Sequence, residues 1–533
     1  MELLLLFSSI VTLFILLLAI YKLPLLFSPK KHLPPSPPGA LPIIGHLRLF
    51  FTSTPLHLTL QSISTKYSNK CTNYIFLKLG VRNVLVLSSP AAVQECIYKN
   101  DVAFANRPRS IANDYTSYDY TNVAFSNYGP LWRDHRRITT TNFFSSTSLH
   151  ESSGVRHDAV RCLLRDLYNT TTTTTAPTTT TTTTTCTMNN GGEVDLKMKF
   201  LELTFNTMMS MSTGEAVGEG LHNTSEENKC FFELLVKDNQ PTSLFMIPGD
   251  YLPWLRYFDV LKIERSVAEV SRMSDEYFEK IVERFRKEYY AEKKSKSVLD
   301  VLFSLQRENP EQYNDQIIKG MILTMFGAGL DTSAITLEWA MSLLLNHPEK
   351  LKKAVHEVDD NIEPHCLLKD SDISNLPYLK SIIQETLRLY PPAPLLIPHE
   401  AAHECKVEQY DIPSGTIVAM NAWAIHRDPK AWPEPDKFMP ERFMRRDDNN
   451  KSKDIMFKFI PFGIGRRGCL GEGLAMHIMT LALGSLLRCF EWDKIGGDDI
   501  DMSEEVHFFL VKAKALKALC KPRLEMLNVL RQV

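Results

Sequence analysis

The order of apolar and polar positions along the chain predicts a mainly helical protein with short strands. A long apolar-rich run from Asp315 to Leu345 follows Asn314, a residue type that caps helix N-termini, and stops before Pro348. Helical periodicity also fits Tyr378–Leu389 and Glu472–Cys489. Short strand patterns occur at Tyr74–Leu79, Val84–Leu87 and Thr416–Met420. We therefore expect a mainly α fold with small β-sheets.

The N-terminal residues contain an apolar run, Leu3–Ile20, long enough to cross the ~30 Å hydrocarbon core of a bilayer. Lysines follow this run and Glu2 precedes it. A cleaved signal peptide is the alternative, but it would carry its positive charge ahead of a shorter apolar stretch. Positive charge after the run places the rest of the chain in the cytosol. We therefore predict a retained anchor at residues 1–28 that crosses the membrane once.

Two segments of biased composition follow the anchor. Prolines crowd residues 29–45 and predict a stiff, extended hinge without internal hydrogen bonds. Threonine fills most of residues 169–187, and such a tract has little large apolar surface to bury. We expect this tract to be a disordered insertion in the main domain, which then spans residues 46–533.

The overall composition excludes several classes of protein. The 533 residues carry 60 Lys and Arg against 62 Asp and Glu, a net charge of −2, so no basic field supports nucleic-acid binding. Hydrophobic residues make up 44% and charged residues 23%, which argues against global disorder and against a polytopic membrane protein. Ten cysteines include no CxxC pair, so we expect reduced thiols on the cytosolic side rather than a disulfide framework or a zinc module.

The strongest candidate for chemistry is the glycine-rich loop FGIGRRGCLG, residues Phe462–Gly471. It holds Cys469 just ahead of a predicted helix, whose N-terminus and backbone N–H groups favour a thiolate. A thiolate below an iron porphyrin donates electron density that favours O–O cleavage. Arg467 in the same loop is placed to reach a haem carboxylate. The loop therefore predicts a haem-thiolate site.

Two formal motifs compete with this interpretation. Gly463, Gly465 and Gly468 match a GxGxxG dinucleotide fingerprint, but only about 65 residues follow, too few for a two-half Rossmann domain built from units of ~30 residues. The segment His399–His403 matches the zinc motif HExxH, which needs both histidines on one helical face. Prolines precede that segment and a strand-like hairpin follows it, so a helix there is disfavoured.

Further residue pairs carry both a plain and a functional interpretation. Glu385 and Arg388 share one face of a predicted helix, where a surface ion pair is the usual outcome. Asp331 and Thr332 interrupt the apolar residues of the long helix. They predict either a packing notch, with Thr332 bonded back to a carbonyl, or a kink that opens a groove for dioxygen and delivers protons.

Together these segments resemble the cytochrome P450 family. FGIGRRGCLG agrees with the family pattern FxxGxRxCxG, AGLDTS with [AG]GxDT[ST], ETLR and PERF with the ExxR and PERF segments, and WRDHRR with WRxxRR. The likeness extends from the anchor through PPSPPGALPIIGHL to CKPR near the C-terminus. Segments such as ITLEWAMS and PHEA are most similar to plant A-type members of the eighty-one family. Leu470, where the family usually has Pro, and the threonine tract depart from the family pattern.

The resemblance implies a cytochrome P450 fold with an N-terminal transmembrane helix, in which residues 46–533 form the haem-thiolate catalytic domain. It implies that Cys469 binds the iron and that Asp331 and Thr332 help to break the O–O bond. A buried structural triad is implied for Glu385, Arg388 and Arg442. The residues implied to approach the haem, mostly at its propionates, are Arg107, Trp132, Arg136, His399, Phe462 and Arg467.

The function implied is that of a monooxygenase in the endoplasmic-reticulum membrane, with its catalytic domain facing the cytosol. We expect it to use O2 and electrons from NADPH-cytochrome P450 reductase to hydroxylate an apolar plant metabolite of the phenolic or isoflavonoid, indole or terpenoid class. The sequence offers no credible nicotinamide or flavin site, so the electrons come from the separate reductase. We expect a basic face suited to an acidic electron donor at Arg133, Arg137, Lys458 and Arg466, and the alternative is ordinary solvated charge.

Two alternatives stay open at this point. The first is a non-hydroxylating member of the same family, which closes a methylenedioxy bridge or acts as an isomerase or dehydratase. The second is a haem sensor or scaffold without enzymatic activity. The residues expected to line the substrate pocket are as often plain core, and they are Tyr115, Tyr118, Tyr120, Phe231, Phe326, Ala328, Ala393, Ile397 and Phe508.

Overall fold

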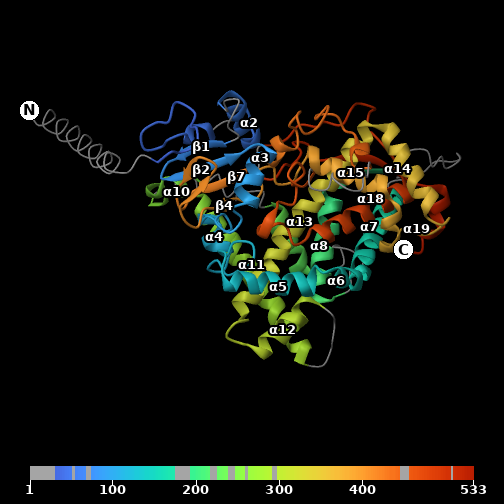
Figure 1. The fold of residues 1–533 in the computed structure, drawn as a ribbon. Helices are drawn as coiled ribbons and strands as arrows, with labels where there is room; N and C mark the ends of the chain where they lie inside the picture. The colour runs from blue at the N-terminus through green and yellow to red at the C-terminus, as the bar shows by residue number, and fades with distance from the viewer. Residues whose placement is uncertain are drawn as a thin grey trace, which may run out of the picture.

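The computed structural model describes residues 31–50, 54–67, 74–173, 192–215, 225–237, 247–257, 262–290, 297–444, 455–505 and 508–533. The predicted anchor at residues 1–28 lies outside these ranges, as does most of the threonine tract. Within the described ranges the chain is mainly helical with small sheets, which confirms the predicted fold class (Figure 1).

Helices make up most of the described chain. In chain order, the α-helices are α2 (Leu56–Tyr67), α3 (Pro90–Val93), α4 (Ile111–Thr116), α5 (Pro130–Phe143), α6 (Ser146–Glu151), α7 (Ser153–Thr173), α8 (Leu196–Thr213), α9 (Glu226–Lys237), α10 (Pro248–Tyr251), α11 (Ile263–Tyr290), α12 (Val298–Glu308), α13 (Asp315–Asn346), α14 (Pro348–Asn361), α15 (Pro377–Leu389), α16 (Ala422–Ile425), α18 (Glu472–Cys489) and α19 (Leu527–Leu530). The short 3-10 or π elements are η1 (Leu47–Phe50), η2 (Gln94–Tyr98), η4 (Pro253–Tyr257), η5 (Asp370–Asn375), η6 (Pro440–Arg442), η7 (Gly465–Arg467) and η8 (Leu524–Met526).

The sheets are small, and one of them lies in the sequence between two strands of another. A four-stranded sheet has the order β1-β2-β7-β4, with β2 and β7 parallel and the other pairs antiparallel. A three-stranded antiparallel sheet has the order β3-β9-β8, and β5 and β6 form a hairpin. The strands are β1 (Tyr74–Leu79), β2 (Arg82–Leu87), β3 (Gly192–Asp195), β4 (His399–Glu400), β5 (Cys405–Val407), β6 (Tyr410–Ile412), β7 (Ile417–Met420), β8 (Phe490–Asp493) and β9 (Lys517–Pro522).

Helix α13 runs through the middle of the molecule and is bounded as the sequence predicted (Figure 1). The side chain of Asn314 caps it by accepting a hydrogen bond from the backbone N–H of Ile317 at 3.1 Å. In the part of the chain that the structure describes, this helix is the one long and apolar enough to span a bilayer, but 61% of its most apolar window is buried. Burial of that extent is what the central helix of a folded domain shows.

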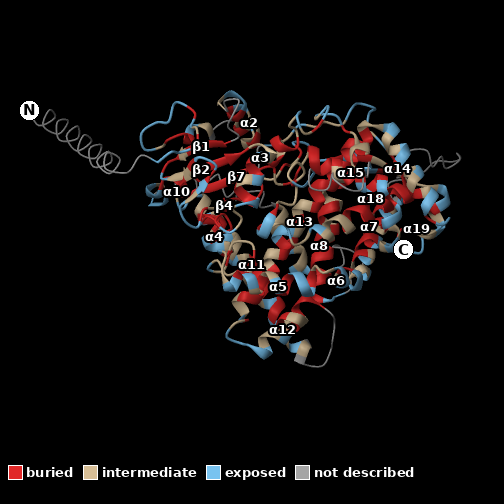
Figure 2. Cartoon of the chain, in the orientation of Figure 1, coloured by how far each residue is buried: buried red, intermediate tan, exposed pale blue. Residues whose placement is uncertain are grey.

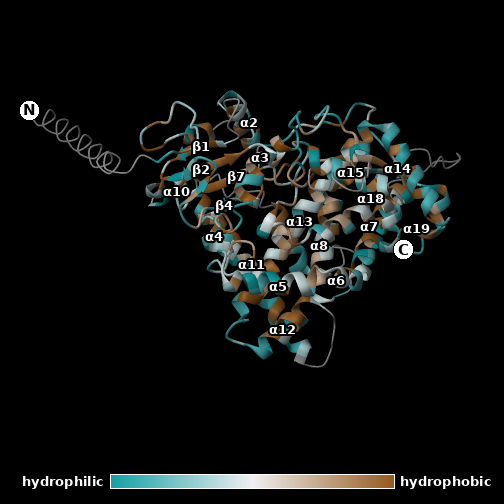
Figure 3. Cartoon of the chain, in the orientation of Figure 1, coloured by the Kyte–Doolittle hydropathy of each residue, from teal (hydrophilic) through white to brown (hydrophobic). Residues whose placement is uncertain are grey.

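The core is built around α13 and continues to the four-stranded sheet. The largest buried cluster joins apolar side chains of α7, α8, α13, α15 and α18. A second cluster joins the sheet to residues Ile460 and Ile464, which precede the cysteine of the glycine-rich loop. Figure 2 shows the resulting buried interior, and Figure 3 shows apolar strands with hydrophilic residues on outer helices such as α14. The glycine-rich loop is thus packed on a buried support.

The described part of the expected hinge is bound to the body of the protein. The carbonyl of Pro35 accepts the N–H of Phe76 at 2.8 Å, and that of Pro37 lies 2.9 Å from Nε2 of the buried His46. The N–H of His32 donates to Asp411 at 2.9 Å. Residues 31–45 therefore contact the domain that was expected to begin at residue 46, and the division into hinge and domain stays a prediction. A proline-rich strand lacks internal hydrogen bonds, so its carbonyls are free to accept bonds from the body.

The threonine tract also begins later than predicted. Helix α7 continues to Thr173, so residues 169–173 are helical rather than part of a disordered insertion. The hydroxyl of Thr170 donates to the carbonyl of Asp166 at 2.8 Å, and that of Thr172 donates to Tyr168 at 2.9 Å. Threonine hydroxyls can bond back to the preceding turn in this way, and a helix therefore accommodates the first threonines. Residues 174–187 lie outside the described ranges.

Candidate functional site

The glycine-rich loop places Cys469 three residues before α18, as the sequence predicted. The N–H of Cys469 donates to the carbonyl of Phe462 at 2.8 Å, which closes the loop on itself. Gly463 and Gly465 have φ values of +71° and +75°, in the left-handed region that side chains with a Cβ rarely adopt. These two glycines therefore serve the turn. The loop is not followed by the strands of a dinucleotide-binding domain, because the elements after it in the described residues are α18, β8, β9, η8 and α19.

The thiol of Cys469 is accessible but desolvated. Its side chain is exposed, yet burial raises its pKa above the ordinary value. Backbone N–H groups of Gly471 and Glu472 and the cation of Arg136 act in the opposite direction. The N–H groups at the start of α18 favour the thiolate there.

Three guanidinium groups gather beside the loop. Arg107 is 5% exposed and Arg467 is 8% exposed, while Arg136 is half-buried. Burial and the charges of the other two arginines hold the pKa of Arg107 well below its usual range, and burial and Arg136 lower the pKa of Arg467 to about 9. Among the described residues, none of the three forms an ion pair with a carboxylate within 4.0 Å. The cluster is therefore positive and uncompensated.

The polar atoms of this cluster are bound to backbone carbonyls. Arg107 donates to the carbonyls of Ile397 at 2.8 Å and Pro398 at 2.7 Å. Arg467 donates to the carbonyl of Ala105 at 2.6 Å, and Arg136 donates to that of Gly468 at 2.9 Å. Arg136 thus holds the carbonyl that directly precedes Cys469.

Trp132 lies between two of these cations. It is 3% exposed, and the guanidinium carbons of Arg136 and Arg467 lie 5.4 Å and 4.5 Å from the centroid of its ring system. Its Nε1 donates to the carbonyl of Val123 at 3.1 Å. Trp132 and Arg136 lie one turn apart on α5, where they make this cation–π contact.

His399 is buried on strand β4, and its Nδ1 lies 2.8 Å from the carbonyl of Phe104. Burial and the nearby cation of Arg107 hold its pKa well below the ordinary value, so the ring is neutral at physiological pH. Glu400 belongs to the same strand, and therefore the two are not presented on a helix as a zinc motif of the HExxH type requires. Within the described ranges, no group of three or more His, Cys, Asp or Glu side chains is placed to hold a metal ion.

The middle of α13 opens on one side and packs tightly on the other. Gly327 and Ala328 are exposed although most of the helix is buried, and a Cβ at Gly327 would meet no atom within 4 Å. A Cβ at Gly329 would lie 2.6 Å from the sulfur of Met208 on α8, so this glycine permits close helix packing. The helix is continuous from Asp315 to Asn346. The exposed residues therefore lie within an unbroken helix, and the groove that the sequence suggested stays a prediction.

Thr332 and Asp331 lie one turn beyond this opening. The hydroxyl of Thr332 donates to the carbonyl of Ala328 at 2.7 Å. The sequence predicted this back-bond as the structural alternative to a role in proton delivery. Burial raises the pKa of Asp331 to about 6, with the cation of Lys197 opposing the rise. An acid with this pKa is present in both protonation states near neutral pH, which suits a group that passes on protons.

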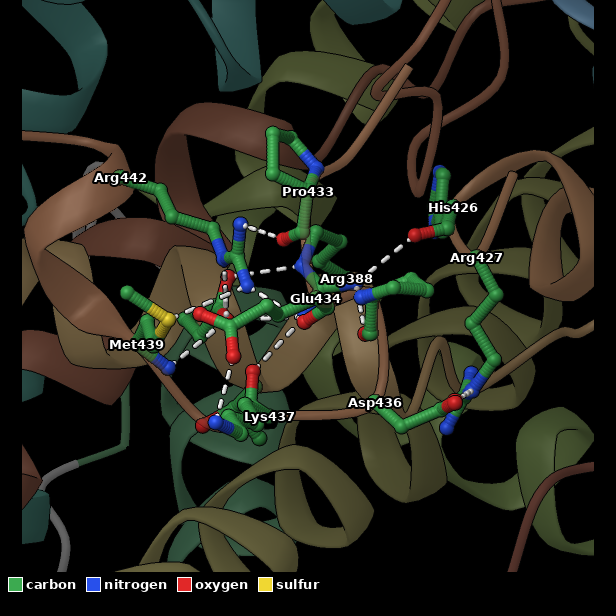
Figure 4. Close-up of polar contacts among 12 residues, drawn as sticks. Arg388, His426, Arg427, Pro433, Glu434, Asp436, Lys437, Met439 and Arg442 are labelled. Carbon is green, nitrogen blue, oxygen red and sulfur yellow. Dashed lines mark hydrogen bonds and ion pairs between the residues drawn. The ribbon is translucent and has the colours of Figure 1, made fainter. Parts of the chain in front are cut away.

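Glu385, Arg388 and Arg442 are brought together by α15 and η6. Glu385 and Arg388 are fully buried and the side chain of Arg442 is 10% exposed, with Nε of Arg442 at 3.2 Å from Oε1 of Glu385. Figure 4 shows how the arginines also bind backbone carbonyls: Arg388 donates to that of His426 at 2.8 Å, and Arg442 donates to that of Glu434 at 2.6 Å. Arg388 also donates to the carbonyl of Pro435 at 2.7 Å. The triad therefore fixes the segment between β7 and the glycine-rich loop.

The tyrosines expected at the substrate pocket bind acidic side chains. Tyr115 donates to Glu264 at 3.1 Å, Tyr118 to Asp275 at 2.7 Å and Tyr120 to Asp114 at 2.9 Å. Glu264 and Asp275 lie on α11, so Tyr115 ties α4 to that helix and Tyr118 ties the segment after α4 to it. Residues 118–120 have φ values of 50°, 55° and 59°, a left-handed turn that costs roughly 1–2 kcal/mol per residue. These phenols therefore act as structural ties.

Two phenylalanines expected at the pocket belong to the core. Phe231 is 3% and Phe326 is 1% exposed, and both pack in an aromatic cluster with Phe205 and Phe278. Phe231 stacks on Tyr277 with ring centroids 3.8 Å apart. Both side chains therefore contribute to the core, since aromatic spacing on helices serves packing as well as ligand binding, and their place at a substrate pocket stays a prediction. Ala328 is exposed, and the other expected pocket residues, Ala393, Ile397 and Phe508, are of intermediate exposure.

Two residues near the loop were not singled out from the sequence. Tyr128 lies 5.4 Å from Trp132 by ring centroids and 5.4 Å from the guanidinium carbon of Arg466. Asp101 binds both the backbone and the side chain of Arg466. Neither belongs to a sequence pattern, and each meets the loop only through the tertiary fold. No local signal in the chain identifies them.

Comparison with known proteins identifies the family. Residues 34–520 match the family described as Cytochrome P450. Cytochrome P450 81Q32 of Catharanthus roseus is 42% identical, over 95% of this chain and 93% of that protein. An isoflavone 2'-hydroxylase of Glycyrrhiza echinata is 39% identical, over 94% of each chain. The (+)-piperitol/(+)-sesamin synthase CYP81Q2 of Sesamum radiatum is 38% identical, over 94% of this chain and 93% of that protein.

Solved structures show the same fold. A zebra fish cytochrome P450 with progesterone superposes with a TM-score of 0.72 at 23% identity, over 88% of this chain and 100% of that chain. The family match covers nearly all of the chain, and the identity to plant members of the eighty-one family is about 40%. The chain therefore belongs to the cytochrome P450 family, and it is a haem-thiolate monooxygenase.

Proposed function

We propose that Cys469 is the axial ligand of the haem iron and that the enzyme hydroxylates an apolar plant phenolic. The observation that carries the ligand assignment is the combination of one accessible, desolvated cysteine with an uncompensated cluster of buried arginines around it. Among the described cysteines, Cys230 is also exposed, but it lies on α9 and not at a helix N-terminus flanked by cations.

The residues present fit a haem. Buried cations without a carboxylate partner are unfavourable, and they mark a place that an anionic group completes. The propionates of a haem are such groups, and Arg107, Arg136 and Arg467 would hold them with Trp132 and the neutral His399 beside them. Phe462, whose carbonyl receives the N–H of Cys469, would pack at the sulfur side. Bound in this way, the haem supplies the activation of dioxygen with two electrons and two protons.

The protein's own residues would then manage the protons. Asp331, with its pKa near 6, can release and regain a proton at neutral pH. The hydroxyl of Thr332 would pass that proton on through water after turning from the carbonyl of Ala328, to which it donates in this structure. The exposed face at Gly327 and Ala328 leaves room for a small ligand beside it. This arrangement supports the proton-relay interpretation of the long helix.

The substrate class is inferred from the relatives. Two of them are named isoflavone 2'-hydroxylases, and another is named for closing methylenedioxy bridges in a lignan-type product, (+)-piperitol/(+)-sesamin. These names share a phenolic, largely apolar scaffold. Hydroxylation is the proposal, and bridge closure is the second candidate because the relative that performs it is 38% identical over nearly the whole chain.

We place the enzyme on the cytosolic side of the endoplasmic-reticulum membrane, held by residues 1–28. Its electron donor would be NADPH-cytochrome P450 reductase, bound at the basic face. Arg133, Arg137 and Arg466 of that face are exposed and Lys458 is half-buried. Exposed cations of this kind favour an acidic partner through long-range attraction, so docking should weaken as salt rises.

The test is turnover of a defined panel of compounds. Purified full-length enzyme with reductase and NADPH is offered isoflavones, lignans with methoxyphenol groups, indoles and terpenoids, and products are identified by mass. A product heavier by one oxygen supports hydroxylation, and a product lighter by two hydrogens supports bridge closure. If NADPH is consumed with no product from any phenolic while a terpenoid or indole is converted, the proposed substrate class is wrong.

A further inference from the structure

Asp101 holds the cysteine loop from a distant part of the chain. Its Oδ1 accepts the backbone N–H of Arg466 at 3.2 Å, across a separation of 365 positions. Its Oδ2 lies 3.2 Å from Nε of the same arginine. One carboxylate therefore binds both the backbone and the side chain of the central residue of η7. That turn is followed directly by Gly468 and Cys469.

The loop is shaped to receive this carboxylate. A Cβ on Gly465 would lie 2.9 Å from Oδ1 of Asp101, closer than real Cβ contacts come. Glycine at 465 thus serves both the left-handed turn and the approach of the acid. On the other side of the turn, Arg136 donates to the carbonyl of Gly468 at 2.9 Å. The turn is therefore held from two directions, by an acid on its N–H and by a cation on its carbonyl.

Asp101 itself follows a well-packed element of the fold. It follows the π-helical element η2, whose Ile97 packs in the same buried cluster as Ile460 and Ile464 of the loop. The side-chain amide of Asn100 donates to the carbonyl of Glu95 at 2.9 Å and closes the turn that presents Asp101. A carboxylate fixed by packing on both sides can set the geometry of its partner more precisely than a free surface acid can.

We propose that Asp101 is a positioning residue for the thiolate, which it places by clamping Arg466 and so fixing the turn ahead of Cys469. The inference rests on the proposed role of Cys469 as the haem ligand. The side chains of Asp101 and Arg466 are 23% and 46% exposed, so dissolved salt weakens the ion pair between them. Arg466 also belongs to the basic face, so an acidic electron donor would compete with Asp101 for the same guanidinium group. The clamp therefore links docking at the surface to the geometry of the thiolate.

Three substitutions separate the two halves of the clamp. Asp101→Ala removes both contacts. Arg466→Ala removes the ion pair and keeps the backbone N–H, while Asp101→Asn keeps an acceptor for that N–H and removes the charge. The matched control is Glu95→Gln: Glu95 lies on the neighbouring η2, its side chain is 22% exposed, and its ion-pair partner is Lys99 rather than the loop.

The measurement is the stability of the thiolate-type band of the reduced, carbon-monoxide-bound haem protein. We expect Asp101→Ala to lose this band roughly tenfold faster than the wild type, since a hydrogen bond to a charged group is lost at a partly exposed site. Asp101→Asn and Arg466→Ala should show equal, smaller accelerations, and Glu95→Gln none. Added salt should accelerate the loss in the wild type and leave Asp101→Ala unchanged.

Two further measurements, the unfolding temperature and the haem reduction potential, distinguish a positioning role from a merely structural one. A merely structural role for Asp101 would lower the unfolding temperature of Asp101→Asn without moving the haem reduction potential; we expect the potential to move and the unfolding temperature to stay. If Asp101→Ala fails to fold, the agreement of Asp101→Asn with Arg466→Ala carries the test. Wild-type behaviour of both overturns the proposal. Cys469→Ser reports separately on the proposed ligand: if it keeps the thiolate-type band, the ligand assignment fails, whatever the Asp101 variants show.

Discussion

Glu385 and Arg388 are both fully buried and are joined by two hydrogen bonds of 2.8 Å, from Nε to Oε2 and from Nη2 to Oε1. The remaining donors of Arg388 bind backbone carbonyls, among them that of His426. The ring of His426 in turn accepts the N–H of Ile460 at 2.9 Å, at the start of the segment that leads into the cysteine loop. The pair is therefore connected to the cysteine loop through His426, whose carbonyl binds Arg388 and whose ring binds Ile460.

Glu385→Gln should destabilise the protein by about 3–5 kcal/mol, because it leaves Arg388 as a buried charge without its counter-ion. We expect the loss to appear in denaturant unfolding and in the fraction of protein that retains haem. The control is Glu434→Gln, whose side chain is 54% exposed and pairs with Lys437. It should leave the free energy of unfolding nearly unchanged, because exposed ion pairs contribute little. Equal effects of the two substitutions would contradict the structural role of the triad.

Cys469→Ser should remove the thiolate-type band in the carbon-monoxide difference spectrum of the reduced protein. A serine hydroxyl ionises far less readily than a thiol and cannot donate the same electron density to iron. Cys230→Ser, at the other exposed cysteine among the described residues, should leave the band unchanged. An unaltered band in Cys469→Ser would show that another residue binds the iron.

Thr332→Ala should uncouple the reaction while haem content and folding stay nearly intact. Loss of the hydroxyl removes a partner for the water that relays protons from Asp331, so NADPH is consumed with more hydrogen peroxide and less product. The loss in product per NADPH is bounded by the ~10²–10⁴-fold that general acid–base groups contribute. Thr324→Ala is the matched control, because its hydroxyl makes the same back-bond, to the carbonyl of Gly320 at 2.7 Å. If both variants keep the wild-type ratio of product to NADPH, the relay role is wrong.

Asp331→Asn should change how stability depends on pH. Burial raises the pKa of Asp331 from 3.8 to about 6, so between these values the folded protein holds a proton that the unfolded chain has lost. Stability contributed at this site therefore falls as pH rises from about 4 to 6 and is constant above. The asparagine variant lacks this fall and should gain roughly 1–3 kcal/mol over the wild type between pH 4.5 and 7.5. Denaturant unfolding at the two pH values measures the difference, and parallel curves for both proteins would refute it.

Deletion of residues 1–28 should release the protein from microsomal membranes at least in part, since a single span supplies most of the attachment. The measurement is the distribution between membrane and soluble fractions after centrifugation. Exposed apolar side chains such as Trp254, at 51% exposure, should leave some residual binding. Secretion of the full-length chain after cleavage near Tyr21 would overturn the predicted topology.

The sequence alone was sufficient to predict several helices and strands. It was also sufficient to predict the parts of the site that lie within one short segment. Asn314 and Pro348 bound the apolar run of α13 because caps and prolines act within a few residues. The predicted strand Tyr74–Leu79 agrees with β1 for a similar reason, since a short apolar run rich in aromatic and β-branched residues is a local signal. The cysteine loop was visible because its glycines and its thiol lie within ten residues of one another.

The tertiary structure decided whatever depends on long-range contacts. Phe231 and Phe326 are large aromatic residues of a kind that also lines pockets, and only their packing against Phe205 shows that they are part of the core. The phenol of Tyr118 and the carboxylate of Asp275 meet across 157 positions, and no local pattern encodes that pair. Asp101 reaches Arg466 because the π-helical element and the cysteine loop share one buried cluster. Apolar burial is non-directional, so it brings distant segments together without a signal in either one.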